Sequence, residues 1–238
     1  MKLVFRLTSL FCCIALLFCS FGCSSDSQPL IDPAAADAVP LQIGIWVPPG
    51  PSLTATAEET DIRYKQIADA GVNLVFGIAD GDTERLSNVL DACEKYGLRY
   101  IVTLSVARTG VVDTDAVTAV VEQTKNHPAV LAYNLMDEPS AERFESLAAL
   151  RETVDALLPE GKFSFCNLFP NYASVEQLTG MAGAETGYDD PYFTYLQQYM
   201  QTVKPKVLSF DHYPFSASPE NAGRSRQTLP IPMYILAL

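Results

Sequence analysis

Two carboxylates stand side by side in the stretch AVLAYNLMDEPS, residues 129–140, where an apolar run ends in Asp137, Glu138 and a proline. Like charges repel, so adjacent acids at the end of an apolar segment point to a chemical purpose. Hydrolysis of a glycosidic bond needs a carboxylic acid that protonates the leaving oxygen. Partial burial and the negative charge of Asp137 would raise the pKa of Glu138 and suit it to that role.

Six short apolar runs recur along the chain and predict parallel strands covered by helices. They span residues 41–47, 72–79, 99–106, 129–136, 163–169 and 206–213. Helical patterns lie between most of them. Thr56 with Glu59 forms a candidate capping box, and Asp82 and Ser140 can cap the next two helices.

Strand and helix alternate at about 30-residue spacing, which predicts right-handed βαβ units. Such units close either into an open doubly wound sheet or into an eight-stranded barrel. The first strand is followed by WVPPGPS, residues 46–52, rather than by a glycine-rich phosphate-binding turn, so the barrel is favoured. We therefore predict an α/β protein with a TIM (β/α)8-type barrel that is incomplete at its C-terminus, with about six to seven strands.

In such a barrel the active site lies where the strands end and the following loops begin. Polar and aromatic residues stand at that point of five predicted strands: Trp46, Asp80, Asp137 with Glu138, Asn167, and Asp211 with His212 and Tyr213. We expect them to meet around one rim, where Trp46 stacks on a sugar ring and the polar side chains contact hydroxyl groups. Because successive strand residues point to opposite faces, only one of Asp137 and Glu138 is expected to face the mouth of the barrel.

Several of these residues also have simpler interpretations. Asp137 and Glu138 could interact with the N-terminus of the helix that follows them. Trp46 could fill the core. His127, which precedes a proline, is interpreted as a structural turn residue, and His212 with Asp211 could form an ordinary hydrogen-bonded pair.

The stretch HPAVLAYNLMDEPS, residues 127–140, resembles the fourth-strand motif of the retaining glycoside hydrolases of clan A, which are (β/α)8 barrels. The resemblance implies that Glu138 is the general acid/base and that Asp137 replaces an asparagine that contacts the substrate. The stretch SFDHYPF, residues 209–215, is similar to the sixth strand of that family, whose polar residues line the sugar site.

The family's second catalytic carboxylate, the nucleophile, ends the seventh strand. Residues 231–238 could form that strand, but no glutamate follows before the sequence stops. A barrel of this kind takes about 250 residues, so we expect a truncated barrel with doubtful turnover. Asp211 is the one acid at a strand end that could substitute for the nucleophile.

The sequence therefore predicts a glycoside hydrolase-like protein acting on oligo- or polysaccharide, with no cofactor and no bound metal. Two alternatives stay open. One is a non-catalytic glycan-binding lipoprotein that keeps Trp46 and the polar rim. The other is a sugar isomerase-like barrel, in which carboxylates and a histidine hold a divalent metal; its ligands would be Asp80, Glu138, Asp211 and His212.

The first 22 residues have the layout of a secretory signal, because Lys2 and Arg6 precede an apolar run that ends in small residues. Gly22-Cys23 resembles the end of a bacterial lipobox, in which the cysteine is acylated. Residues 23–40 form a flexible linker, and residues 41–238 form the truncated barrel domain. We expect an exported lipoprotein, anchored to the membrane only through lipid on Cys23, on the periplasmic or cell-surface side of the outer membrane.

The formal net charge of −12 becomes −14 once Lys2 and Arg6 leave with the signal, and so acidic a chain is not expected to bind nucleic acid. Of the six cysteines only Cys93 and Cys166 lie beyond Cys23. Both are predicted to be buried apolar residues rather than a disulfide or a metal site. Carbohydrate is the predicted partner, and the sequence does not define the oligomeric state.

Overall fold

The computed structural model describes residues 41–78, 82–104, 113–183 and 190–212. Contacts divide the chain into two units, Met1–Leu41 and Gln42–Leu238, and every described helix and strand lies in the second. Cys23, Asp80, Tyr213 and the expected seventh strand lie outside the described residues. Among the described helices, none combines the length and apolar character needed to cross a membrane.

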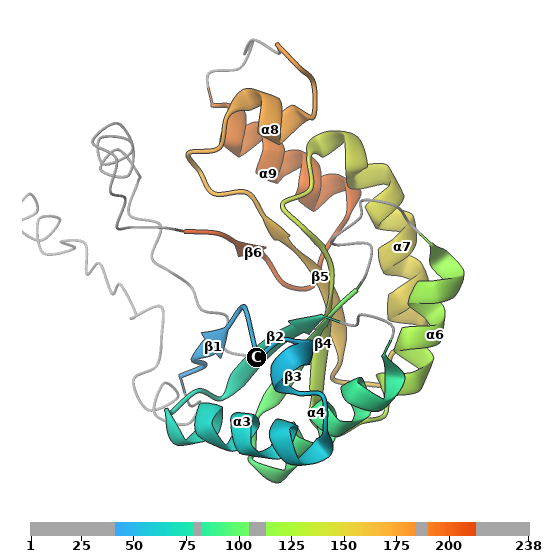
Figure 1. Ribbon diagram of the computed structural model, residues 1–238. Coiled ribbons are helices and arrows are strands. Elements are labelled where there is room, and N and C mark those ends of the chain that lie inside the picture. The colour runs from blue at the N-terminus through green and yellow to red at the C-terminus, as the bar shows by residue number, and fades with distance from the viewer. Residues whose placement is uncertain (1–40, 79–81, 105–112, 184–189, 213–238) are drawn as a thin grey trace, which may run out of the picture. The chain divides into compact units, whose positions relative to one another are not determined.

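Six parallel strands form one sheet, and their order in the sheet is their order in the sequence (Figure 1). A doubly wound sheet would reverse its strand order at a switch point, and this sheet has none. The sheet instead curls into a half-barrel, so the predicted α/β class with a partial TIM-type barrel is confirmed. The strands are β1 (Gly44–Ile45), β2 (Leu74–Ile78), β3 (Arg99–Thr103), β4 (Val130–Asp137), β5 (Phe163–Leu168) and β6 (Ser209–Phe210).

Helices fill the connections between the strands (Figure 1). Asp113 caps α6 by accepting a hydrogen bond from the Ala116 N–H, and Ser174 caps α8 in a capping box with Gln177. Neither helix was predicted from the sequence. The helices are α3 (Ala57–Asp69), α4 (Thr83–Lys95), α6 (Thr114–Thr124), α7 (Phe144–Leu157), α8 (Val175–Thr179) and α9 (Pro191–Thr202), with short 3-10 helices η1 (Pro51–Leu53) and η2 (Ala141–Arg143).

The predicted helix caps are confirmed in two cases and wrong in one. Thr56 and Glu59 form the expected capping box at the start of α3, and the Asp82 side chain caps α4. Ser140 makes no side-chain cap, because the chain passes through η2 before α7 begins. In that turn the Arg143 N–H donates to the carbonyl oxygen of Ser140, so the main chain takes the place of the hydroxyl.

The two faces of the sheet are covered differently. The outward face packs against the helices in the larger apolar cluster, and Cys93 and Cys166 are buried free thiols in that cluster, as predicted. The inward face carries a smaller cluster whose buried members all come from strands or strand ends: Leu74, Ile101, Ala132, Phe163 and Phe165. Polar residues that continue this inward face therefore reach the carboxyl ends of the strands together.

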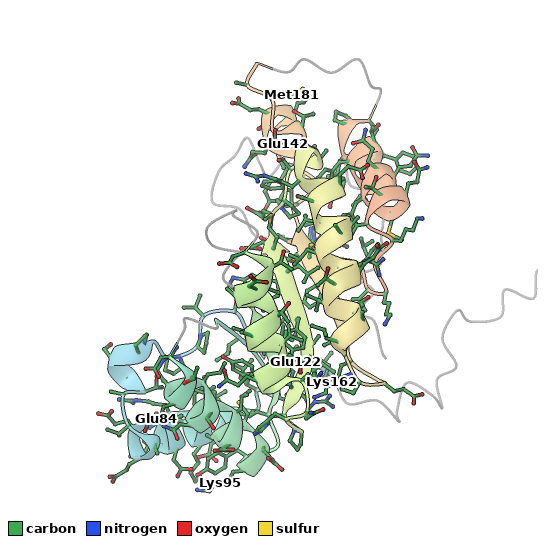
Figure 2. The ribbon with its side chains drawn as sticks, turned by 90° about the vertical axis from the view of Figure 1, so that its right-hand side faces the viewer. Glu84, Lys95, Glu122, Glu142, Lys162 and Met181 are labelled. Atoms are coloured by element: carbon green, nitrogen blue, oxygen red, sulfur yellow. The ribbon has the colours of Figure 1, made fainter. Side chains whose placement is uncertain are left out.

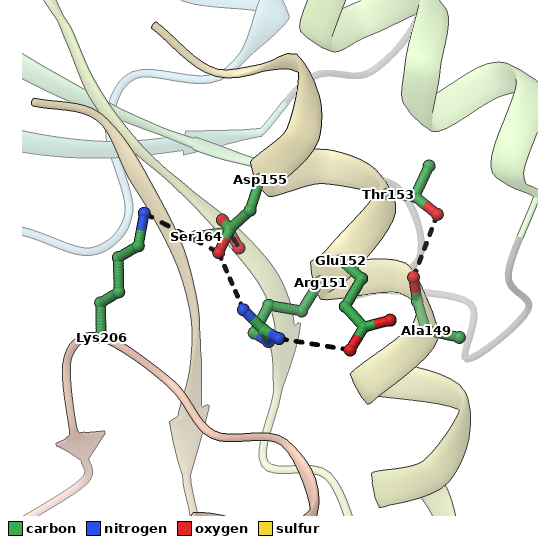
Figure 3. Close-up of polar contacts among 7 residues, drawn as sticks. All are labelled: Ala149, Arg151, Glu152, Thr153, Asp155, Ser164 and Lys206. Atoms are coloured by element: carbon green, nitrogen blue, oxygen red, sulfur yellow. Dashed lines mark hydrogen bonds and ion pairs between the residues drawn. The ribbon is translucent and has the colours of Figure 1, made fainter. Parts of the chain in front are cut away.

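Helix α7 runs along the outside of the sheet from one edge to the other. Figure 2 labels Glu142, just before α7, near one end of the helix and Lys162, just before β5, near the other. Near this second end Asp155 accepts a hydrogen bond from Ser164 Oγ at 2.7 Å and pairs with Arg151 at 3.0 Å (Figure 3). The Asp155 side chain is only 12% exposed, and its bond to Ser164 joins the end of α7 to β5, while its pair with Arg151 lies within the helix.

His127 lies at the amino edge of the sheet, where β4 and β5 begin. Its carbonyl oxygen accepts a hydrogen bond from Lys162 Nζ at 2.7 Å, and its Nδ1 accepts one from the Ala129 N–H at 3.2 Å. These bonds close the turn that leads into β4. They support the interpretation of His127 as a structural residue.

Candidate functional site

One buried amide joins two of the predicted site carboxylates at the carboxyl edge of the sheet. Asn167 Nδ2 donates to Asp137 Oδ1 at 3.1 Å and to Asp211 Oδ1 at 2.8 Å. Ser209 Oγ donates to Asn167 Oδ1 at 2.8 Å. Because an ionised carboxylate can only accept hydrogen bonds, the opposite orientation of the amide would place oxygen against oxygen. The contacts therefore fix which side of the amide faces the acids.

A β-bulge brings Asp137 to the same face of the sheet as Asn167. Asn134 pairs with Phe165 and Asp137 pairs with Asn167, so β4 advances three residues while β5 advances two. The extra residue shifts the alternation of side chains, and Asp137 shares the inward face with Asn134. Without the bulge its carboxylate would lie on the opposite face from Asn167.

Glu138 reaches the same cluster through an unusual backbone conformation. Its φ of 47° lies in the left-handed region, which residues other than glycine seldom adopt. The Glu138 N–H donates to the Asn167 carbonyl oxygen at 2.7 Å, and Tyr195 Oη donates to the Pro139 carbonyl oxygen at 2.7 Å. These two bonds hold the main chain on both sides of the strained residue.

The carboxyl of Glu138 experiences the negative charges of both Asp211 and Asp137. The expectation that only one of the two adjacent acids faces the mouth is therefore wrong. It assumed a regular strand, whereas the bulge turns Asp137 inward and the left-handed φ turns Glu138 toward the same cluster.

The surroundings of Glu138 favour its protonated form. Burial contributes most, and the charges of Asp211 and Asp137 add to it, raising the pKa of Glu138 from 4.5 to about 7. Burial also raises the pKa of Asp137, although the hydrogen bond from Asn167 acts in the opposite direction. A carboxyl with a pKa near neutrality can both donate and accept a proton at physiological pH.

The position of Asp211 bears on the reaction that this site could perform. Retaining glycosidases place their two carboxyl groups about 5–5.5 Å apart, and inverting ones about 6.5–9.5 Å apart. The charge of Asp211 acts on Glu138 from the same edge of the sheet, so Asp211 is the carboxylate available as the second member of such a pair.

Two further predicted site residues lie outside this hydrogen-bonded cluster. The Trp46 ring packs against Phe76, with ring centroids 4.9 Å apart, and 42% of Trp46 is exposed. His212 is exposed and, within the described ranges, forms no hydrogen bond with the three acids. Trp46 nevertheless follows β1, and His212 follows β6, so both stand at the carboxyl edge.

The structure adds two residues to the site that sequence reasoning did not place there. Tyr195 has the helical spacing of a packing residue, and Ser209 has no distinguishing signal. Outside the site, Asn134 is fully buried on β4, and neither atom of its amide has a hydrogen-bond partner among the described residues. An amide within an apolar strand is a signal that could have identified Asn134, since buried polar groups are normally satisfied.

The group of residues best arranged to ligate a metal lies at the other edge of the sheet. Among the described residues, the group with ligand atoms within 4.8 Å of one another consists of Asp91, Glu94 and His127. His127 Nδ1 accepts the Ala129 N–H, so its Nε2 carries the proton that faces Asp91. A metal on Nε2 would have to displace that proton. This geometry favours a structural role for the group.

Comparisons with known proteins give a distant similarity in fold. No protein-family model matches the sequence, and no curated protein sequence matches it. GH5_18 from Streptomyces cattleya, solved in complex with GlcNAc, is 12% identical with a TM-score of 0.43, over 52% of this chain and 42% of that one. The Pseudomonas stutzeri endoglucanase Cel5A is 15% identical with a TM-score of 0.35, over 60% of this chain and 63% of that one.

The matched region thus spans less than two thirds of either known chain. The likeness to these two proteins is one of fold. The roles of individual residues in this chain rest on its own geometry.

Proposed function

We propose that this chain is a glycoside hydrolase-like protein that acts on oligo- or polysaccharide, with Glu138 as its general acid/base. One observation carries the proposal. The Glu138 carboxyl is partly buried and lies beside the charges of two further acids, at the edge of a half-barrel where α/β barrels hold their active sites. A cluster of three acids with one proton suits a reaction that needs both a proton donor and negative charge.

In the proposed reaction, protonated Glu138 donates its proton to the glycosidic oxygen as the bond from that oxygen to the sugar carbon breaks. A water molecule forms the new bond to that carbon and gives its proton to Asp211. Asp137 and Asp211 then stabilise the positive charge that develops on the sugar ring. A sugar and a water molecule that enter between Glu138 and Asp211 would hold the two carboxyls apart, as an inverting reaction requires. The proposed substrate contacts are Trp46, Asp80, Asp137, Asn167, Asp211, His212 and Tyr213.

The second candidate is a glycan-binding protein without turnover. The observation in its favour is the Trp46 ring, which is 42% exposed, follows β1 at the carboxyl edge and could stack on a sugar without any catalytic acid. This candidate predicts that glycan binding survives the change Glu138→Gln. A metal-dependent isomerase has less support, because Glu138, Asp211 and His212 are not part of a ligand group among the described residues. Activity that persists in EDTA would argue against it further.

The test compares two kinds of glycoside in the wild-type chain and in Glu138→Gln. A nitrophenyl glycoside has a leaving group that departs without a proton, whereas an oligosaccharide needs an acid. Loss of Glu138 should therefore slow oligosaccharide hydrolysis about 100-fold or more and slow cleavage of the nitrophenyl bond less. The matched control is Glu160→Gln, an exposed acid in the turn before β5, which should leave both rates unchanged. A wild-type chain that neither cleaves nor binds glycans refutes the proposal.

The proposed setting for this activity is the periplasmic or cell-surface side of the outer membrane, with the chain anchored through lipid on Cys23. The support is the signal-like first 22 residues and the Gly22-Cys23 pair. An anchor of two acyl chains would hold the protein stably, whereas one chain would bind reversibly.

A further inference from the structure

We infer that Asn167 is a positioning residue that assigns the reacting proton of the three-acid cluster to Glu138. It does so by donating its side-chain N–H groups to the two aspartates, which holds them as hydrogen-bond acceptors. The cluster, as we use the term, consists of Asp137, Glu138 and Asp211. The inference rests on the acid role proposed for Glu138.

The Asn167 side chain is suited to this task because its hydrogen bonds leave it one orientation. Its amide nitrogen donates to both aspartates, and its amide oxygen is occupied by the Ser209 hydroxyl. The residue is 3% exposed, so little water reaches the amide to compete for these bonds. It sits on β5, between the strands that carry Asp137 and Asp211, so the sheet itself fixes the three positions.

Some interaction must determine which of the three acids holds the proton. Three carboxylates gathered at one edge repel one another when all are ionised, and this repulsion favours the protonated form of one of them near neutral pH. Hydrogen bonds from a neutral donor stabilise the ionised form of the group that receives them. Asp137 and Asp211 each receive such a bond from Asn167, while the influences of Asp137 and Asp211 on Glu138 all favour its protonated form.

Two tyrosines on α9 lie near the three acids, and their hydroxyls donate elsewhere. The charge of Glu138 acts on Tyr195, whose hydroxyl donates to the Pro139 carbonyl. The charge of Asp211 acts on Tyr192, whose hydroxyl donates to the Phe169 carbonyl. His212 follows Asp211 and is exposed. Asn167 is thus the side-chain donor that acts on both aspartates among the described contacts.

The effect of the Asn167 side chain can be tested separately because the bond between Asn167 and Glu138 is made by the main chain. The Asn167 main-chain carbonyl accepts the Glu138 N–H at 2.7 Å. The change Asn167→Leu keeps this bond and a similar side-chain shape, and removes only the two amide N–H donors and the amide oxygen. A change in the titration of Glu138 would then report the lost donors and not a displaced main chain.

The experiment follows the titration of Glu138 in the full chain by NMR, with glutamate labelled at the side-chain carboxyl carbon. The Glu138 signal is assigned from its absence in Glu138→Gln. In the wild type we expect one step near pH 7. In Asn167→Leu the proton is shared with the aspartates, so the midpoint of Glu138 should fall by about one pH unit or more and the step should broaden. A midpoint that stays or rises overturns the inference.

Two further variants complete the test. Asn134→Leu makes the same substitution on the same inward face but removes no hydrogen bond to a carboxylate, so the Glu138 midpoint should stay at its wild-type value. Ser209→Ala keeps the Asn167 amide and removes the hydroxyl that orients it, so a smaller fall is expected. If Asn167→Leu fails to fold, an unchanged midpoint in Ser209→Ala overturns the inference.

The readout needs no turnover, so the two proposals can fail separately. Absence of hydrolysis with the expected titration would refute the glycosidase and leave the role of Asn167 in place. Hydrolysis that depends on Glu138, with no effect of Asn167→Leu on its titration, would refute the role of Asn167 alone.

Discussion

The change Glu138→Gln should make the folded protein more stable at neutral and alkaline pH and leave its stability unchanged in acid. The reason is the unfavourable surroundings of the ionised carboxyl, which the neutral amide avoids. Between about pH 4.5 and pH 7, native Glu138 keeps a proton that the unfolded chain has already lost. The native state then binds more protons than the unfolded state, so the free energy of unfolding falls as the pH rises through this window.

The size of the effect follows from the difference in pKa. A rise from 4.5 to about 7 corresponds to about 3 kcal/mol for a fully shielded group, at about 1.4 kcal/mol per pH unit. Glu138 is only partly buried, so solvent screening reduces this figure, and we expect about 1–2 kcal/mol. For a domain of this size that corresponds to a melting temperature about 2–8 °C higher in Glu138→Gln at pH 8.

The assay is thermal or urea unfolding of the wild type, Glu138→Gln and Glu160→Gln at a series of pH values from 4 to 8.5, chosen to bracket about two pH units on each side of the window. The curves of wild type and Glu138→Gln should coincide near pH 4 and separate as the pH rises, while Glu160→Gln should follow the wild type throughout. Parallel curves for wild type and Glu138→Gln at all pH values would show that Glu138 carries no raised pKa, and the electrostatic reasoning would fail.

Three other changes test separate features. Tyr195→Phe leaves the buried Pro139 carbonyl without its donor and should lower the free energy of unfolding by about 1–3 kcal/mol, measured by urea denaturation, whereas Phe193→Leu on the exposed side of α9 should not. Gly77→Ala would place a Cβ 1.7 Å from Tyr100 Oη and should destabilise by about 1–3 kcal/mol; an unchanged melting temperature would contradict the packing of β2 against Tyr100. Cys23→Ala should abolish labelling of the exported chain by radioactive palmitate and release it from the membrane fraction, and labelling that persists would refute the lipid anchor.

Much of the fold could be predicted from the sequence because the relevant signals are local. Apolar runs and capping residues each act over a few positions, so the six strands, the capping box at Thr56 and the cap at Asp82 were accessible. The absence of a phosphate-binding turn after the first strand correctly favoured the barrel topology over the doubly wound sheet. The edge strands β1 and β6 are much shorter than their apolar runs, because pairing depends on a neighbouring strand as well as on sequence.

The arrangement of the site could be predicted only in part. Strand ends identified Asp137, Asn167 and Asp211 as neighbours at one edge, because parallel strands bring their carboxyl ends together. The bulge in β4 and the left-handed Glu138 could not be read from the sequence, since both depend on the pairing of β4 with β5. The assumption of a regular strand therefore gave the wrong orientation for one of the adjacent acids.

The bond from Tyr195 to the Pro139 carbonyl joins positions 56 residues apart in the chain. A chain is synthesised from its N-terminus, so a growing polypeptide that ends just after β5 already contains β4 and the two adjacent acids. It does not yet contain α9, whose Tyr195 bonds the main chain next to those acids. The acid pair would therefore acquire its final geometry late in biosynthesis. A nascent chain lacking α9 would expose carboxyls that titrate more like those of a free peptide.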